Sequence, residues 1–166
     1  MKHIKVDNEN YKLIVWDTTG CERFKCLSKK YYQNADGVLL LFDVTHEESF
    51  ASVSNWMKEV KDNSNRNITN DSNNQPEISL YLIGNKIDHP DRIITKEEAQ
   101  KLANSLGMKY FETSCKLNMN IPEVMARIIM ESHMRINHID NIDNSKFNKE
   151  YVRINSFKKL NKFLSF

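Results

Sequence analysis

The chain has 166 residues, of which 40% are hydrophobic and 28% charged, with a formal net charge of +2. This length suits one domain with a real hydrophobic core and is too short for two. The nearly neutral charge gives no sign of a nucleic-acid-binding surface, so we expect no nucleic-acid partner. No apolar run approaches the roughly 18 residues of a membrane span, and the N-terminus lacks the apolar core of a signal peptide. Three scattered cysteines without C-x-x-C spacing argue against a disulfide framework or zinc site and favour a reducing, intracellular compartment.

The first third of the chain has the patterns of strands with a short helix between them. Residues 2–7 alternate polar and apolar side chains and residues 11–16 are strongly apolar, which predicts a β-hairpin. Mixed helical spacing over residues 22–35 predicts a short, irregular helix. The continuous apolar run 37–44 is typical of a strand that is buried on both faces of a parallel sheet.

An amphipathic helix and a polar loop follow. We expect Thr45 to cap a helix whose apolar side chains recur at helical spacing from Phe50 to Val60. Residues 62–76 are Asn-rich and lack apolar anchors, which predicts a disordered surface insertion without an assigned function.

The second half continues the alternation of strands and helices. Residues 78–83 form another apolar run, and Thr95 begins a capping box for a helix that ends at Gly107. A short strand over residues 108–111 and a helix over residues 120–137 complete the pattern.

This alternation predicts an α/β fold with a doubly wound, mostly parallel sheet and helices on both faces. We expect one domain over residues 1–137 and a polar, loosely ordered tail over residues 138–166. Polar motifs follow the predicted strands after Val15, Ile83 and Phe111. Ligands of such sheets bind at the carboxyl ends of the strands, so these motifs mark the expected site.

The first of these motifs contains Asp17 and, three residues later, Gly20. A carboxylate at a strand's end can hold Mg²⁺ through water, and a glycine lets a backbone N–H approach a terminal phosphate closely. D-T-x-G alone also fits a solvated turn. The whole stretch 16–24 (WDTTGCERF) resembles the switch II region of Rab-type small GTPases in the Ras superfamily.

Two further motifs carry the same resemblance. Asn85-Lys86-Ile87-Asp88 is similar to the N-K-x-D motif that recognises guanine, and Ser114-Cys115-Lys116 is similar to the family's S-A-K. The resemblance covers residues 1 to 133 and implies binding of GTP or GDP with Mg²⁺. The nucleotide-binding residues that it implies are Asp17, Gly20, Asn85, Lys86, Asp88, Ser114, Cys115 and Lys116, with Asp17 also near the metal.

The implied roles on the base side follow hydrogen-bond chemistry. The Asp88 carboxylate accepts from the N1–H and 2-amino groups of guanine, and adenine lacks that pair of donors. The stem of Lys86 lies along the ring, while Asn85 ties the loop together. A backbone N–H at position 115 meets the guanine carbonyl oxygen, a contact that survives alanine-to-cysteine replacement. We expect Cys115 itself to be a small, buried thiol.

The resemblance also implies partners. Trp16, Phe24 and Tyr32 match aromatic positions with which Rab proteins meet effectors, and the alternative is that they belong to the core. Because Cys21 stands at the family's water-orienting glutamine and cysteine is too short for that role, we leave enzymatic activity open and expect slow GTP hydrolysis.

The family's phosphate-binding motif G-x-x-x-x-G-K-[ST] does not occur in this sequence, and neither do its first strand, first helix and switch I threonine. In the family that first strand lies between the strands that correspond here to residues 11–16 and 37–43. Its absence would leave two open edges inside the sheet, unless the two strands pair directly. A truncated or misassembled chain is the simpler expectation.

The end of the chain also departs from the Rab pattern. No cysteine follows Cys115, so we expect no prenyl anchor. The basic, amphipathic tail 157–166 could touch a membrane surface weakly, although a frayed or self-packed tail is the alternative. Two functions remain open: a guanine-nucleotide switch in vesicle trafficking, or a degenerate GTPase-like module that binds proteins without hydrolysing nucleotide. We expect an intracellular location, either cytoplasmic or on the cytosolic face of endomembranes.

Overall fold

The computed structural model describes residues 2–6, 9–17, 31–33, 35–64, 78–140 and 151–156. Its centre is a six-stranded sheet in the order β1-β2-β6-β3-β4-β5, in which only the β1–β2 pair is antiparallel. The strands are β1 Lys2–Val6, β2 Glu9–Asp17, β3 Gly37–Asp43, β4 Ser79–Asn85, β5 Lys109–Thr113 and β6 Tyr151–Ser156. The helices are α2 Glu47–Ala51, α3 Val53–Asn63, α4 Lys96–Leu106 and α5 Ile121–Asp140.

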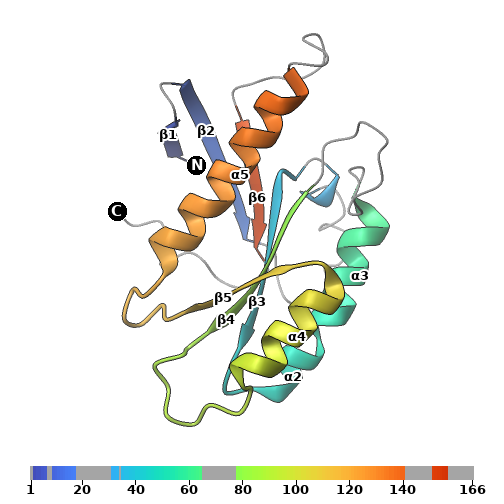
Figure 1. The fold of residues 1–166 in the computed structure, drawn as a ribbon, viewed down its shortest axis with the longest axis vertical. Helices are drawn as coiled ribbons and strands as arrows, with labels where there is room; N and C mark the ends of the chain where they lie inside the picture. The colour runs from blue at the N-terminus through green and yellow to red at the C-terminus, as the bar shows by residue number, and fades with distance from the viewer. Residues whose placement is uncertain are drawn as a thin grey trace.

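Helices cover both faces of the sheet, as predicted (Figure 1). Alternate residues of β3 point to opposite sides, so Leu40 packs in the cluster under α3 and α4, while Leu39 packs in the cluster under α5. Both side chains are 2% exposed. This burial on both faces explains why the predicted strand is a continuous apolar run rather than an alternating one.

Strand β6 lies between β2 and β3, at the position where the sequence indicated a missing strand. It pairs in parallel with β2 from Lys12↔Tyr151 to Asp17↔Ser156, and with β3 from Gly37↔Ile154 to Leu39↔Ser156. The two flanking strands therefore neither pair directly nor face each other across an open gap. Within the tail 138–166, which the sequence predicts to be loosely ordered, the structure describes the end of α5 at Asp140 and the strand Tyr151–Ser156. Residues 141–150 and 157–166 of this predicted tail lie outside the described residues.

Local signals explain most helix ends. Thr95 and Glu98 form the predicted capping box of α4, and Gly107 ends that helix in the left-handed conformation with φ 70°. The predicted cap at Thr45 was wrong: the hydroxyl group of Thr45 donates to Asp43 at 2.7 Å, and His46 caps α2 instead.

Some predicted segments extend beyond the described residues. Of the predicted helix 22–35, the structure describes residues 31–33 and 35, and Tyr31 and Tyr32 are helical. The predicted loop 62–76 begins later than expected, since α3 continues to Asn63, and residues 65–77 lie outside the described part. No helix in the described part is long and apolar enough to cross a membrane.

Candidate functional site

The carboxyl ends of three neighbouring strands meet at one edge of the sheet. Asp43 of β3 is in register with Asn85 of β4, and Asn85 is in register with Thr113 of β5. Residues 86–88 and 114–116 follow these strand ends directly. The motifs predicted after the second and third of these strands are therefore brought together, because parallel strands present their carboxyl ends on the same side.

Asn85 connects the two motif loops. Its side-chain oxygen accepts hydrogen bonds from the Thr113 hydroxyl at 3.3 Å, the Cys115 backbone N–H at 3.2 Å and the Cys115 thiol at 3.0 Å. The N–H of Ile87 also donates to the carbonyl oxygen of Thr113, at 3.3 Å. Asn85 thus has the tying role that the sequence suggested for it.

Ser114 holds the carboxylate of Asp88. The Ser114 hydroxyl, which is fully buried, donates to an Asp88 carboxylate oxygen and accepts from the N–H of Leu117 at 3.0 Å. The hydrogen bond from Ser114 lowers the pKa of Asp88, and the charge of Lys116 acts in the same direction. Asp88 is therefore ionised at neutral pH and is an acceptor with a fixed orientation.

Lys86 has an unusual backbone conformation and a charged partner. Its φ of 68° lies in the left-handed region, which costs free energy in a residue with a side chain. Its ammonium group forms an ion pair with the Asp43 carboxylate. Sequence reasoning missed Asp43 as a site residue, although a carboxylate at the carboxyl end of a buried strand was a signal that could have found it.

Cys115 differs from the expectation of a buried thiol, because it is exposed. Partial desolvation nevertheless raises the pKa of the Cys115 thiol, and the nearby negative charge of Asp88 adds to this effect. The thiol is therefore mostly protonated at neutral pH and donates to Asn85.

The phosphate-side residues are less completely described. Gly20 and Cys21 lie outside the described residues, as does Phe24. Asp17 is exposed at the end of β2, where it is in register with Ser156, and Ser156 is in register with Leu39. Because β3 continues from Leu39 to Asp43, Asp17 lies about 13 Å behind the end of β3 along the strand direction. The structure therefore does not bring Asp17 to the base-side loops.

The described residues include some of the positions expected to bind metal or effectors. Among the described residues, no three histidine, cysteine, aspartate or glutamate side chains gather in a way that could hold a metal ion. Trp16 is 43% exposed, and its ring lies 4.7 Å from that of Tyr31. The inclusion of Tyr32 among the effector-facing aromatic residues was wrong, because Tyr32 is fully buried in the core.

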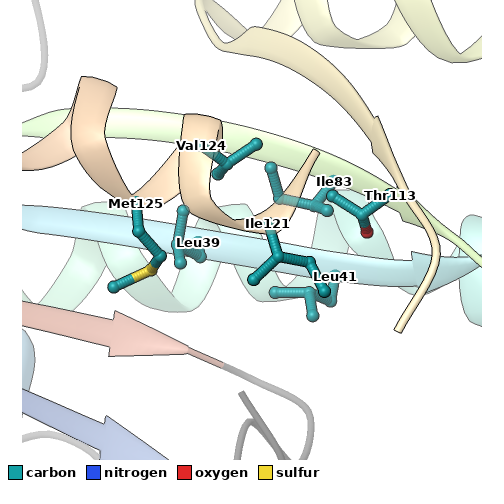
Figure 2. Close-up of a pocket in the computed structure, with 7 residues that line it drawn as sticks. All are labelled: Leu39, Leu41, Ile83, Thr113, Ile121, Val124 and Met125. Atoms are coloured by element: carbon teal, nitrogen blue, oxygen red, sulfur yellow. The ribbon is translucent and has the colours of Figure 1, made fainter. Parts of the chain in front are cut away.

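A separate apolar pocket lies beside the first turns of α5 (Figure 2). Side chains from β3, β4 and α5 face it, with Thr113 as the polar member near the strand ends. The lining residues are Leu39, Leu41, Ile83, Thr113, Ile121, Val124 and Met125. This pocket has no charged group and does not coincide with the polar loops after β4 and β5.

Comparisons with known proteins agree with these motifs. The model of the Ras family matches residues 1–134. Ras-related protein Rab-13 of Bos taurus is 37% identical over 129 residues, which cover 77% of this chain and 59% of the relative. Ras-related protein RABE1d of Arabidopsis thaliana is 34% identical over 142 residues, 84% of this chain and 61% of the relative.

A third relative gives a similar result. Ras-related protein Rab-8A of Gallus gallus is 36% identical over 122 residues, which cover 73% of this chain and 54% of the relative. The chain therefore spans between 54% and 61% of the length of these three relatives. The match over residues 1–134 includes all three polar motifs. The chain belongs to the Ras family, and within that family it is similar to Ras-related proteins of the Rab type.

Proposed function

We propose that this protein binds guanine nucleotides and works as a Rab-like switch in intracellular vesicle trafficking, at the cytosolic face of endomembranes. GTP and GDP are the proposed ligands, with Mg²⁺ at the phosphate end. The proposed partners are effector and regulator proteins. Family membership supports the general class, and the base-side geometry supports the choice of nucleotide.

One observation carries the proposal: Ser114 orients an ionised Asp88 carboxylate, while Asn85 joins the loop of Asp88 to the loop of Ser114. Two neighbouring donors on the edge of guanine match the two oxygens of a carboxylate. Adenine would leave this acceptor without those donors, which disfavours its binding. The proposed base contacts are Asn85, Lys86, Asp88, Ser114, Cys115 and Lys116.

The phosphate end of the proposed site lies at the carboxyl end of β2. Asp17 is an exposed carboxylate at a strand end, and a carboxylate oxygen is a ligand that suits Mg²⁺, directly or through water. When bound, Mg²⁺ would neutralise charge on the phosphate oxygens. We propose Asp17 and Gly20 as the residues of this chain on that side.

The test is a change of base preference in Asp88→Asn. An asparagine oxygen can still accept from Ser114, so the loop keeps its shape, but its amide donates where the carboxylate accepted. We expect GDP affinity, measured by calorimetry, to fall about 10- to 100-fold. Xanthosine diphosphate, which has a carbonyl group in place of the 2-amino group, should gain affinity. Equal binding of GDP and ADP by the unchanged protein would contradict the proposal.

A protein-binding module is the second candidate, because Trp16 is an exposed aromatic residue beside Tyr31. Such aromatic side chains are common anchors of protein interfaces. Trp16→Ala should then abolish capture of a partner from cell extract while GDP binding stays unchanged. A partner that binds the nucleotide-free protein as tightly as the GTP-loaded protein would favour the module over the switch.

A further inference from the structure

The pairing of Asp43 with Lys86 gives the site a residue that none of its motifs contains. Asp43 ends β3, one strand away from the N-K-x-D loop that follows β4. We propose that Asp43 is a positioning residue that holds the Lys86 side chain in the orientation needed for contact with a guanine ring. This inference rests on the proposed function and adds to it a specific determinant on β3.

The surroundings of Asp43 fix its carboxylate before Lys86 is considered. One carboxylate oxygen accepts from the backbone N–H of Thr45 at 2.9 Å and from the Thr45 hydroxyl at 2.7 Å. The other oxygen pairs with the Lys86 ammonium group. The Asp43 side chain is only 13% exposed. The ammonium group therefore meets a carboxylate whose direction is already set.

The ammonium group of Lys86 is paired, while the side chain as a whole stays 54% exposed. A lysine with a free head would distribute its four-carbon stem over many rotamers, and ordering it on binding would cost entropy. Pairing with Asp43 removes part of that cost in advance, so the exposed stem is available to a flat ring.

The backbone of Lys86 supports the same conclusion independently. A positive φ at a residue with a side chain persists only where the surrounding structure favours it. On one side of Lys86, the side-chain oxygen of Asn85 accepts a hydrogen bond from the backbone N–H of Cys115 in the loop after β5. On the other side, the backbone N–H of His89 donates to the carbonyl oxygen of Lys86 at 2.9 Å and closes a turn. The site thus fixes both the backbone and the head of Lys86.

The experiment is a double-mutant cycle with Asp43→Asn and Lys86→Met, read out as GDP affinity by calorimetry. Asparagine has nearly the same shape as aspartate and still accepts from Thr45, so the change removes mainly the charge. We expect Asp43→Asn to weaken GDP binding about 5- to 10-fold. In the Lys86→Met background the same change should alter binding less than about twofold.

Glu131→Gln is the matched control. Glu131 accepts from the ammonium group of Lys109 at 2.5 Å, with side-chain exposures of 24% and 58%, so this pair resembles Asp43–Lys86 in type and burial. Lys109 begins β5 and lies at the opposite end of that strand from the site. Breaking this control pair should leave GDP affinity unchanged.

The outcomes separate the inference from the function on which it rests. Folded, unchanged protein that binds no GDP would overturn the proposed function and this inference together. GDP binding that is equal in the unchanged protein and Asp43→Asn, or an equal loss with and without Lys86, would overturn the inference alone. If Asp43→Asn unfolds, Asp43→Glu keeps the charge and takes its place in the cycle, where its effect should again disappear without Lys86.

Discussion

At the scale of single residues, the candidate site consists of side chains that hold one another before any ligand arrives. Asn85 accepts from two groups of Cys115, Ser114 donates to Asp88, and Asp43 pairs with Lys86. Such preorganisation lowers the entropic cost of ligand binding. It also makes the ionisation of these groups sensitive to the loss of a partner.

Asp43 should make protein stability depend on pH in a defined window. Burial by itself raises the pKa of Asp43, but hydrogen bonds from Lys86 and Thr45 outweigh it and lower the pKa to about 2 from 3.8. A depressed pKa in the folded state contributes stability that is complete above the unfolded-state value. Relative to Asp43→Asn, this extra free energy of unfolding should be constant above about pH 4 and disappear as the pH falls towards 2.

Urea unfolding followed by circular dichroism at a series of pH values measures this difference. In the Lys86→Met background, the stability difference caused by Asp43→Asn should change over a narrower pH range, because one of the groups that lower the Asp43 pKa is removed. A difference between the unchanged protein and Asp43→Asn that stayed constant down to pH 2 would show that the Asp43 pKa is not depressed.

Cys115 provides a reporter for nucleotide at the base side. Desolvation raises the pKa of its thiol, so alkylation by iodoacetamide should be slow at pH 7 and accelerate as the pH rises towards 9. If the base lies over residues 114–116, GDP should slow this reaction several-fold and ADP should not. Mass spectrometry of the peptide that contains Cys115 gives the rate. Equal alkylation rates with GDP and ADP would argue that the base does not cover this position.

At the scale of elements, helix α5 and strand β3 fit each other through the absence of a side chain. A Cβ atom added to Gly37 would lie 2.6 Å from Cδ1 and 2.8 Å from Cγ1 of Ile128. Ile128 is fully buried, so its side chain has little room to move away. Gly37→Ala should therefore destabilise the protein by about 1–3 kcal/mol through overpacking.

The close approach of Gly37 to Ile128 also predicts a second substitution that should offset the first. Ile128→Val removes the nearer carbon atom, so it should restore part of the stability lost in Gly37→Ala, and the two changes should not be additive. Gly107→Ala is the contrasting variant, since no atom lies within 4 Å of its added Cβ and its cost comes from φ 70°. Ile128→Val should not relieve that cost. Denaturant midpoints of the single and double variants test both statements.

Local chemistry also explains which elements could be predicted from sequence. The apolar run of β3 and the Thr95 capping box each carry their signal within a few residues, and both were confirmed. The Thr45 cap failed because the carboxylate of Asp43 lies close enough to take the Thr45 hydroxyl as a donor. The Asp43–Lys86 pair was missed because it joins the last residue of β3 to the first residue after β4, and their proximity depends on the register of β3 with β4.

At the scale of the whole molecule, β6 is the part of the described fold that sequence patterns did not reveal. The segment Tyr151–Ser156 alternates apolar and polar side chains at Val152 to Asn155, but it is short and follows a polar, Asn-rich stretch. Its position depends on β2 and β3, which lie more than a hundred residues earlier in the chain. Such nonlocal pairing leaves no signature in neighbouring residues, whereas the polar motifs after β4 and β5 need only the parallel order of the sheet.

Because β6 lies between β2 and β3, it joins the β1–β2 hairpin to the rest of the sheet. Proline in a central strand removes a ladder donor and forces the backbone away from its neighbours. Ile154, which is in register with Val15 on one side and Gly37 on the other, is the position at which proline should separate the two parts. Ile154→Pro should expose the backbone amides of β2 to hydrogen exchange while those of β4 and β5 stay protected.

Hydrogen exchange followed by mass spectrometry resolves these strands, and Ile154→Val, which keeps the backbone N–H, is the control. If Ile154→Pro accelerates exchange in β2 alone, the hairpin depends on β6 while the base-side loops, which follow β4 and β5, do not. GDP binding should then survive in Ile154→Pro, since the proposed base contacts lie in residues 85–88 and 114–116. Equal protection of β2 in both variants would mean that β6 does not hold the hairpin to the sheet.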